Sequence, residues 1–447
     1  MAANFFWRGL FALTAIALAA CDRGPELPES AGYGPNPTLP EPHPTGAFPY
    51  VNIARAVGWP SGAKPTAAEG LTVEAFATGL DHPRWLYELP NGDILVAETD
   101  APAQSEEVGT GGVRGFFMGL YMRQAGSSKP SANRITLLRD ADGDGMAETK
   151  EVFLENLNSP FGMALVGDQL YVAKADSLVR FPYKEGDTRI EAPPEKVADL
   201  PAGRNHHWTK SLVADPVGSR LYVGVGSNSN IAEHGMEEEH NRAAILEINP
   251  VTGETRVFAS GLRNPVGMDW NPATGDLWVA VNERDEIGDN LVPDYMTKVS
   301  DGAFYGWPYS YYGQHVDERM QPQNPELVKQ AVRPDYALGS HTASLGFTFV
   351  GDADLGSFQN GSIIGQHGSW NRSPRSGYRV MFVKFDNGAP VGAPKEVLTG
   401  FLNERGEAQG RPVGVIIDKR GGLLVADDVG GVVWRASAAK AETKEGD

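Results

Sequence analysis

The chain has 447 residues, of which 41% are hydrophobic, and its net charge is −18 at pH 7. This acidic balance excludes nucleic acid as a partner, because binding to phosphates needs a basic face, and it favours neutral or cationic partners. Only one cysteine is present, so neither disulfides nor thiolate metal sites are expected. In so acidic a chain, any group of Arg and Lys side chains favours the binding of an anion.

The first residues form a predicted export signal. Arg8 precedes an apolar run, 10–17, that is too short to span a bilayer. The following Leu-Ala-Ala-Cys resembles the lipobox of bacterial lipoproteins, so we expect residues 1–20 to be removed and Cys21 to be lipidated. An ordinary secretory signal that happens to contain a cysteine is the alternative. Asp22 favours retention in the inner membrane, which predicts a lipid-anchored protein that faces the periplasm.

The segment 21–50 is rich in proline, from Pro25 to Pro49. Such a segment favours extended, polyproline-like conformations, so we expect it to be a spacer between the membrane and a globular body. The body is predicted to cover residues 51–437 as one domain, and the charged tail 438–447 is expected to be frayed.

Six times along the body, a turn signal and an apolar strand are followed by a Gly or Asp turn and a second strand. The pairs are 82–85 with 94–97, 159–162 with 170–173, 208–213 with 221–224, 264–267 with 277–280, 344–347 with 362–365, and 411–414 with 423–426. Their spacing of about 50–80 residues suits four-stranded blades. The pattern predicts an all-β fold, a six-bladed β-propeller, with one funnel where loops from every blade converge.

One segment departs from the strand pattern. Residues 113–123, Val-Arg-Gly-Phe-Phe-Met-Gly-Leu-Tyr-Met-Arg, are typical of a short apolar helix in a loop between blade strands. Packing against the body is the expected role, and contact with a membrane or a partner is the alternative.

An acidic loop follows it. Asp140, Asp142 and Asp144 stand at alternate positions, Gly145 follows, and Glu151 falls at position twelve, which is the spacing of a calcium loop. Strand-like flanks replace the usual two helices, so an acidic hairpin turn without an ion is the alternative. If calcium binds here, we expect it to brace a hairpin and to take no part in catalysis.

Histidines supply candidates for a general base. His206 and His207 open the third repeat, where a side chain at the start of a strand would face the funnel and could accept a proton near neutral pH. Tandem histidines are also ordinary in loops. His341 and His367 are further candidates, and no zinc-binding spacing joins any of these residues.

The fourth repeat carries the densest set of polar residues. Arg263 can bind a carboxylate through its fork of donors, and the loop 282–290 offers carboxylate and carbonyl oxygens to a hard cation. For an isolated turn, solvated charges would be the simpler interpretation.

The motifs taken together resemble the soluble glucose dehydrogenase and sorbosone dehydrogenase group, which depends on pyrroloquinoline quinone (PQQ). The pieces are Gly-Leu-Arg-Asn-Pro-x-Gly at 261–267, Asp-Glu-Ile at 285–287 and Tyr-Gly-Trp-Pro at 305–308. His-His-Trp-Thr-Lys-Ser at 206–211, His-Gly-Ser-Trp-Asn-Arg at 367–372 and Gly-Arg-Pro-Val-Gly-Val at 410–415 resemble the sorbosone dehydrogenase branch. The resemblance covers about residues 71–437 and implies a six-bladed propeller with PQQ bound to calcium in the funnel.

The resemblance also implies roles for individual residues. His207 would take the proton from the substrate hydroxyl while a hydride passes to the quinone. The residues expected to hold PQQ are Arg263, Asn264 and Arg411, with Lys210, Arg372 and Asn158 as companions. PQQ carries three carboxylates, which would explain why an acidic protein gathers cations.

Two positions depart from the glucose enzymes. Where those enzymes bind calcium through the carbonyls of a Gly-Pro pair, this chain has Glu283 and Arg284. Where they place an Asp that orients the catalytic histidine, this chain has Ser227, which stabilises a protonated imidazole less than a carboxylate does. The base is therefore tuned differently, or it receives an acidic partner from another loop.

These observations predict an exported PQQ-dependent dehydrogenase of a sugar or a sugar-derived aldehyde. A membrane tether would hold it near an electron acceptor such as a quinone or a cytochrome. Two alternatives stay open: a calcium-dependent propeller lactonase, and a propeller lipoprotein that binds a partner without catalysis.

Overall fold

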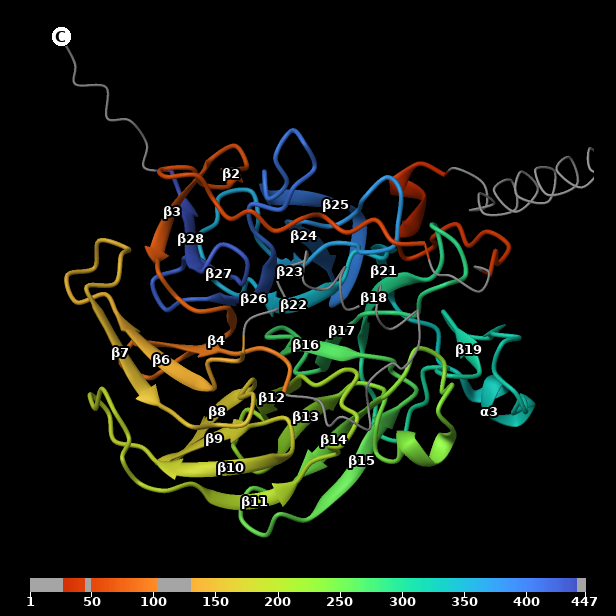
Figure 1. Ribbon diagram of the computed structural model, residues 1–447, viewed down its shortest axis with the longest axis horizontal. Helices are drawn as coiled ribbons and strands as arrows, with labels where there is room; N and C mark the ends of the chain where they lie inside the picture. Colours follow the sequence, from red (N-terminus) through yellow and green to blue (C-terminus); the bar gives the residue numbers. More distant parts are fainter. Residues whose placement is uncertain (1–26, 45–49, 103–129, 440–447) are drawn as a thin grey trace, which may run out of the picture.

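The structure, a computed structural model, describes residues 27–44, 50–102 and 130–439. The predicted signal, Cys21 and the apolar segment 113–123 lie outside these residues. The regular structure of the described chain is nearly all β-strand, and six sheets of four or five strands are arranged around a ring (Figure 1). The predicted six-bladed propeller is therefore confirmed. Within the described residues, no helix has the length and apolar character needed to cross a bilayer.

Each blade is an antiparallel sheet, and in the first three blades the four strands follow one another along the chain. The first three blades are β4 (Pro83–Glu88), β5 (Ile94–Glu98), β6 (Arg134–Arg139) and β7 (Thr149–Leu154); β8 (Met163–Val166), β9 (Gln169–Ala173), β10 (Ser177–Pro182) and β11 (Glu195–Asp199); and β12 (Lys210–Ala214), β13 (Leu221–Val225), β14 (Ala244–Ile248) and β15 (Thr255–Ser260). Each of the six sequence repeats corresponds to the first two strands of one blade.

The next two blades carry a fifth strand from the N-terminal part of the chain. The fourth is β16 (Pro265–Trp270), β17 (Leu277–Val281), β18 (Pro293–Lys298) and β21 (Tyr336–Ser340), extended by β1 (Tyr33–Gly34). The fifth is β22 (Ser344–Phe349), β23 (Gly361–Gln366), β24 (Arg379–Asp386) and β25 (Ala389–Thr399), extended by β2 (Thr66–Ala67). A long insertion between β18 and β21 holds β19 (Ser310–Tyr311), β20 (His315–Val316) and the helix α3 (Pro325–Gln330).

The sixth blade closes the ring. It consists of β26 (Pro412–Ile417), β27 (Leu423–Asp427) and β28 (Val432–Ala438), and its outer strand is β3 (Leu71–Ala77). β28 and β3 lie side by side in Figure 1, in antiparallel register with Ala436 opposite Val73. Backbone hydrogen bonds between the two ends of the body therefore lock the ring.

Apolar side chains from all six blades meet at the centre of the ring. One buried cluster contains Trp85, Phe161, Trp208, Val266, Leu345 and Val413, each on the innermost strand of its blade or just before it. The centre is the one place where six inner strands converge, so this cluster fills it. Sites on the two ends of the ring are consequently separated by a packed core.

Glycines in the repeated motif allow the inner strands to lie this close together. A Cβ at Gly162 would lie 2.3 Å from the backbone nitrogen of Leu212, and one at Gly346 would lie 2.0 Å from the carbonyl of Val413. Both contacts reach the next blade of the ring. The Pro-x-Gly pattern thus reflects close backbone approach, which only glycine permits.

The N-terminal segment differs from the expected spacer. Residues 27–44 lie on the propeller: Tyr33 pairs with Leu338 in β21, and the Arg379 guanidinium donates to the Tyr33 hydroxyl at 2.7 Å and also to Glu29. Further along, the backbone nitrogen of His43 donates to the carbonyl of Ile287 at 2.9 Å. The edge of β21 and the partly buried guanidinium of Arg379 give this proline-rich segment partners that its composition does not reveal.

Candidate active site

The residues predicted to bind the cofactor or to act in catalysis share one end of the ring. Inner strands all start at this end, and each second strand, being antiparallel to its inner strand, finishes there. We call it the funnel face: it carries the starts of β4, β8, β12, β16, β22 and β26 and the loops that follow β5, β9, β13, β17, β23 and β27. The residues that the resemblance implicates in function lie at the starts of inner strands or in the loops after second strands. The topology therefore brings them to one place.

His207 lies just before β12, with its imidazole held in one orientation. Its Nδ1 lies 2.8 Å from the carbonyl oxygen and 3.0 Å from the hydroxyl oxygen of Ser227. The Ser227 hydroxyl donates to the carbonyl of Ser229 at 2.6 Å, so it accepts from the imidazole. Nδ1 therefore carries the proton, and Nε2, which has no hydrogen-bond partner among the described residues, keeps a free lone pair.

The surroundings of His207 favour its neutral form. Burial lowers the pKa of His207 well below its ordinary value, and the positive charge of Arg263 lowers it further. A neutral imidazole with an open Nε2 is the form of histidine that can accept a proton at pH 7. Among the described residues, no carboxylate contacts this ring.

Asn264 lies against the same stretch of backbone as His207. A Cβ at Gly226 would come within 2.3 Å of the Asn264 Oδ1 and 2.5 Å of the His207 Cβ. Asn264 is 5% exposed, and its Oδ1 is buried without a hydrogen-bond partner in the described chain. An unsatisfied buried amide oxygen is costly, which favours a ligand at this position.

Arg263 is fully engaged with the loop that follows β17. Its guanidinium donates to the carbonyl of Glu283 at 2.6 Å and to Asp285 at 3.2 Å, and it also contacts Asn230. Asp285 in turn accepts from His341 at 3.1 Å and from Asn371 at 2.9 Å, so it links the fourth and fifth blades. Burial alone would raise the pKa of Asp285, but the His341 hydrogen bond and the Arg263 charge outweigh it and lower the pKa to about 2.

A second polar cluster joins the first, fifth and sixth blades. The Asp428 carboxylate accepts from Arg84 at 2.7 Å and from His367 at 2.8 Å, and His82 lies 3.8 Å away. The Arg84 guanidinium lies over the Trp208 ring at 5.9 Å, which places it on the central apolar cluster. Burial lowers the pKa of His367 to about 4, despite Asp428.

Arg411 lies just before β26, near this cluster. One of its terminal nitrogens donates to the carbonyl of Ala54 at 3.0 Å, and its guanidinium lies over the Tyr378 ring at 5.5 Å. The Nε atoms of Arg84 and Arg411 and the Oδ1 of Asp428 are buried without partners in the described part of the chain. Two guanidinium groups with spare donors are suited to a carboxylate ligand.

Three predicted cofactor residues make contacts within the protein instead. Lys210 is fully buried, and its ammonium group donates to the Trp208 carbonyl at 3.1 Å. Arg372 donates to the carbonyls of Asp289 and Pro374 at 2.8 and 2.7 Å. Asn158 is exposed and donates to Asp176 at 2.8 Å. Roles of these residues in cofactor binding stay predictions.

The predicted calcium carbonyls lie beside a cation. The Glu283 carbonyl is the one that accepts from Arg263 at 2.6 Å. The Arg284 side chain is buried. Its guanidinium donates hydrogen bonds to Glu283, to Asp317 and to the carbonyls of Pro308 and Ser310. A divalent ion on the Glu283 carbonyl would face the guanidinium at close range, so this arrangement does not suit calcium.

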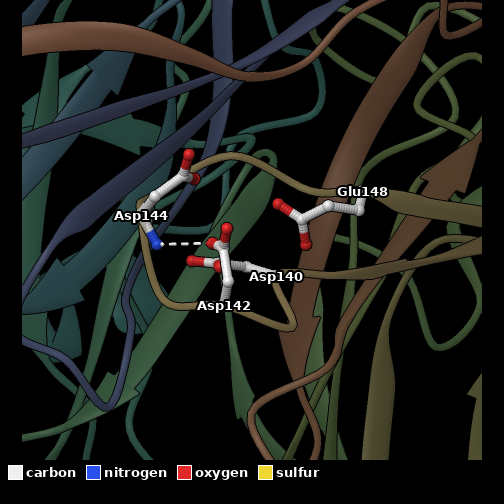
Figure 2. Close-up of side chains that lie close together, drawn as sticks. All are labelled: Asp140, Asp142, Asp144 and Glu148. Carbon is white, nitrogen blue, oxygen red and sulfur yellow. Dashed lines mark hydrogen bonds between the residues drawn. The ribbon is translucent and has the colours of Figure 1, made fainter.

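The acidic loop lies on the opposite end of the ring, because it connects the third and fourth strands of the first blade. Its carboxylates point toward one another (Figure 2), but the group is Asp140, Asp142, Asp144 and Glu148. The prediction of Glu151 is corrected: that residue lies in β7, paired with Leu137. A strand follows this loop, whereas a helix follows the usual calcium loop. Glu151, at position twelve, is therefore not directed at the other carboxylates. Asp140 also forms an ion pair with Arg420.

Several residues of the funnel face escaped the sequence analysis. Arg84 belongs to a His-Pro-Arg-Trp motif that indicates only the start of a strand, and Asp428 follows the last repeat. Their contact joins residues 344 positions apart. The available signal was an Arg among otherwise apolar positions after the repeated proline, together with a charged pair, Asp427-Asp428, at the end of a second strand.

Comparison with known proteins supports the family resemblance. Residues 130–301 and 312–438 match the TrAA12-like family. A protein of Borreliella burgdorferi is 28% identical over 293 residues, which are 63% of this chain and 76% of that protein. A pyrroloquinoline quinone-dependent pyranose dehydrogenase of Coprinopsis cinerea is 26% identical over 289 residues, 51% of this chain and 39% of that enzyme.

A solved structure agrees in fold. The holo form of the PQQ domain of the Coprinopsis cinerea pyranose dehydrogenase superposes with a TM-score of 0.68 at 20% sequence identity, and the match covers 86% of this chain and all of that domain. The family match extends over more than half of the chain and includes most of the blades. The chain belongs to the TrAA12-like family.

Proposed function

We propose that this protein is a PQQ-dependent dehydrogenase that oxidises a sugar or a sugar-derived aldehyde, with His207 as the general base. The observation that carries the proposal is the free Nε2 of a neutral His207, held beside the unpartnered amide oxygen of Asn264. The family match and the PQQ-dependent relative support the cofactor. Predicted lipidation at Cys21 extends the proposal to an exported, membrane-anchored enzyme.

The residues of the funnel face fit PQQ. Asn264, Arg84 and Arg411 each have a buried polar atom without a partner, and the last two are cations in a chain of net charge −18. Guanidinium groups bind carboxylates, of which PQQ has three. We therefore assign cofactor binding to these residues together with Arg263, which would exchange its long contacts to the carbonyls of Asn230 and Asn282, each 3.4 Å, for the ligand and keep the Glu283 carbonyl.

Bound PQQ would supply the hydride acceptor. His207 Nε2 would accept the proton of the substrate hydroxyl, which a neutral imidazole can do at pH 7. Ser227 would hold the imidazole during this transfer through its carbonyl and hydroxyl oxygens. The partial charge of these oxygens would stabilise the protonated ring, although less than a carboxylate would.

Calcium does not fit the predicted carbonyl position while Arg263 occupies it, so no step of the mechanism depends on a metal ion. A lactonase would hold its metal with side-chain carboxylates in the funnel. Within the described residues, the one grouping of three or more potential metal ligands is the Asp140 loop on the opposite end. On the funnel face, Asp285 and Asp428 are bound to Arg and His partners.

The test is a titration of the purified protein with PQQ, followed by absorbance, with and without Ca²⁺ after chelation. Reduction of an artificial acceptor is then measured on a panel of sugars and sugar aldehydes. We expect micromolar PQQ affinity, and we expect His207→Ala to lower kcat by about 10²- to 10⁴-fold with PQQ affinity preserved. His315→Ala, an exposed histidine on β20, is the control. Absence of PQQ binding would overturn the proposal.

A further inference from the structure

The loop that holds His207 is clamped by one short segment behind it. This segment starts with Glu239, the last residue of the 3₁₀ helix η3 (Met236–Glu239), and ends with Arg242, just before β14. The backbone nitrogen of Arg242 donates to the carbonyl of Glu239 at 3.0 Å, which makes the two residues one turn. Both side chains are buried, at 5% and 6% exposure.

Arg242 bridges two backbone segments that flank His207: the loop that follows β13 and the segment that precedes His207. On one side its guanidinium donates to the carbonyl of Gly226 at 3.1 Å, next to Ser227. On the other side it donates to the carbonyls of Pro201 and Ala202, each at 3.0 Å, and to the Asn205 Oδ1 at 2.7 Å. Four acceptors on two loops use the planar fork of arginine, which lysine cannot reproduce.

Glu239 fixes the residues that orient the imidazole. Its carboxylate accepts from the Asn228 backbone nitrogen at 2.7 Å and from the Ser229 hydroxyl. The Ser229 carbonyl orients the Ser227 hydroxyl, which accepts from His207. No carboxylate of the described chain contacts the His207 imidazole directly. The Glu239 carboxylate instead holds the residues around Ser227, so it fixes the position of the imidazole without placing a charge beside it.

The charges around His207 are unusual for a base. Arg263, Arg242 and His206 act on its ring from neighbouring elements, and each disfavours a protonated imidazole. Arg242 has no carboxylate within 4 Å in the described chain, and neither has Lys210, which shares the Asn205 Oδ1 at 3.3 Å. Glu239 and Glu238 act on the charge of Arg242 from beyond 4 Å, so its guanidinium is held mainly by neutral acceptors.

We propose that Glu239 and Arg242 are positioning residues for His207: together they set the distance between the histidine loop and the Gly226–Ser229 backbone. This inference rests on the assignment of His207 as the base. It goes beyond that assignment because it concerns residues that touch neither substrate nor cofactor.

Carbethoxylation of His207 in the cofactor-free protein tests the clamp without any turnover. Diethyl pyrocarbonate reacts with a neutral imidazole nitrogen, so the rate at His207, mapped by fragmentation mass spectrometry, reports its pKa through the pH midpoint. We expect Arg242→Met to raise this midpoint, because a released histidine loop is less buried and a neighbouring cation is removed. Arg242→Lys keeps the charge, so we expect its midpoint to stay near that of the parent.

Turnover in the PQQ-loaded enzyme tests the positioning. We expect Arg242→Lys and Glu239→Gln to lower kcat by about 10- to 100-fold with little change in KM, because the base is displaced. Glu237→Gln, exposed on the same 3₁₀ helix, and Arg256→Met, exposed on β15, are matched controls for charge loss. Thermal unfolding shows which variants are folded.

The proposal is wrong if Arg242→Met leaves the midpoint in place and Arg242→Lys and Glu239→Gln keep kcat within about twofold of the parent. If Arg242→Met does not fold, the two kcat measurements decide alone. The carbethoxylation experiment needs neither PQQ nor sugar, so a failure of the dehydrogenase function would leave its outcome interpretable.

Discussion

Ser227 accepts the Nδ1 hydrogen of His207 through two oxygens, the main-chain carbonyl at 2.8 Å and the hydroxyl at 3.0 Å. A main-chain carbonyl is carried by any residue at this position, so the tautomer of the imidazole does not depend on the side chain. The side chain instead decides how strongly the protonated ring is stabilised. This relationship separates the orientation of the imidazole from its basicity.

Replacing Ser227 by Asp should therefore change the pH dependence more than the orientation. A carboxylate beside the imidazole favours its charged form, which raises the pKa of His207. We expect the acid limb of the kcat/KM profile of Ser227→Asp to move to higher pH by about one to two units. In Ser227→Ala the carbonyl remains, and we expect kcat to fall by less than about tenfold. An unmoved acid limb in Ser227→Asp would mean that His207 is not the group that titrates.

Arg84 is expected to bind the cofactor as strongly as Arg411 does. Each has an unpartnered buried Nε near the centre of the funnel face, and hydrogen bonds to charged groups contribute about 1.5–3 kcal/mol. Arg84→Met and Arg411→Met should each raise the Kd of PQQ by about 10- to 100-fold in the absorbance titration. Arg256→Met is the exposed control. A Kd that rises for Arg411→Met alone would show that Arg84 serves only its ion pair with Asp428.

Local patterns predicted the blades but not the closure of the ring. The inner hairpins are visible in the sequence because proline, glycine and apolar residues recur at the start of most inner strands, and Gly162 and Gly346 show why a glycine is needed there. The β3 strand carries no comparable signal of its partner: nothing in residues 71–77 indicates pairing with β28 at the other end of the chain. Pairing between distant segments is a property of the assembled ring.

The candidate site was predictable to the same extent. Position at the start of a repeat made His206 and His207 candidates, but the choice of His207 and the roles of Asn264 and Arg411 came from the family resemblance of the motifs around them. Arg84 and Asp428 became candidates only through their mutual contact across the ring closure. Glu148 replaced Glu151 because the flanking strand, rather than the spacing, decides which carboxylate turns inward.

Asp285 should contribute to stability in a pH-dependent way. Its folded-state pKa of about 2 lies below the value of about 3.9 in an unfolded chain. A depressed pKa stabilises the fold above the unfolded value, and this contribution is lost as the pH falls through the folded value. We expect Asp285→Asn to lower the free energy of unfolding by about 2 kcal/mol at pH 6, with the difference disappearing between about pH 4 and pH 2. Urea unfolding at each pH measures it, and a difference independent of pH would contradict the assignment.

Tyr33 should stabilise the propeller although it lies in the proline-rich segment. Its ring packs so closely on the fourth blade that a Cβ at Gly339 would lie 2.6 Å from it, and its hydroxyl accepts from Arg379 and donates to Glu29. A detached spacer would contribute nothing to the free energy of unfolding. We expect Tyr33→Ala to lower it by about 2 kcal/mol, through lost packing and the loss of one partner of the partly buried Arg379 guanidinium.

Tyr33→Phe separates these two contributions. It keeps the ring and removes the hydroxyl, so we expect a loss of about 1 kcal/mol in the same urea experiment. Val57→Ala, an exposed residue in the same N-terminal part of the chain, is the control and should leave stability unchanged. Should Tyr33→Ala unfold at the same urea concentration as the parent, the contacts of residues 27–44 with the fourth and fifth blades would carry no free energy. The segment would then act as the spacer that its composition predicts, because only contacts that stabilise the folded state can hold it against the entropy of an extended chain.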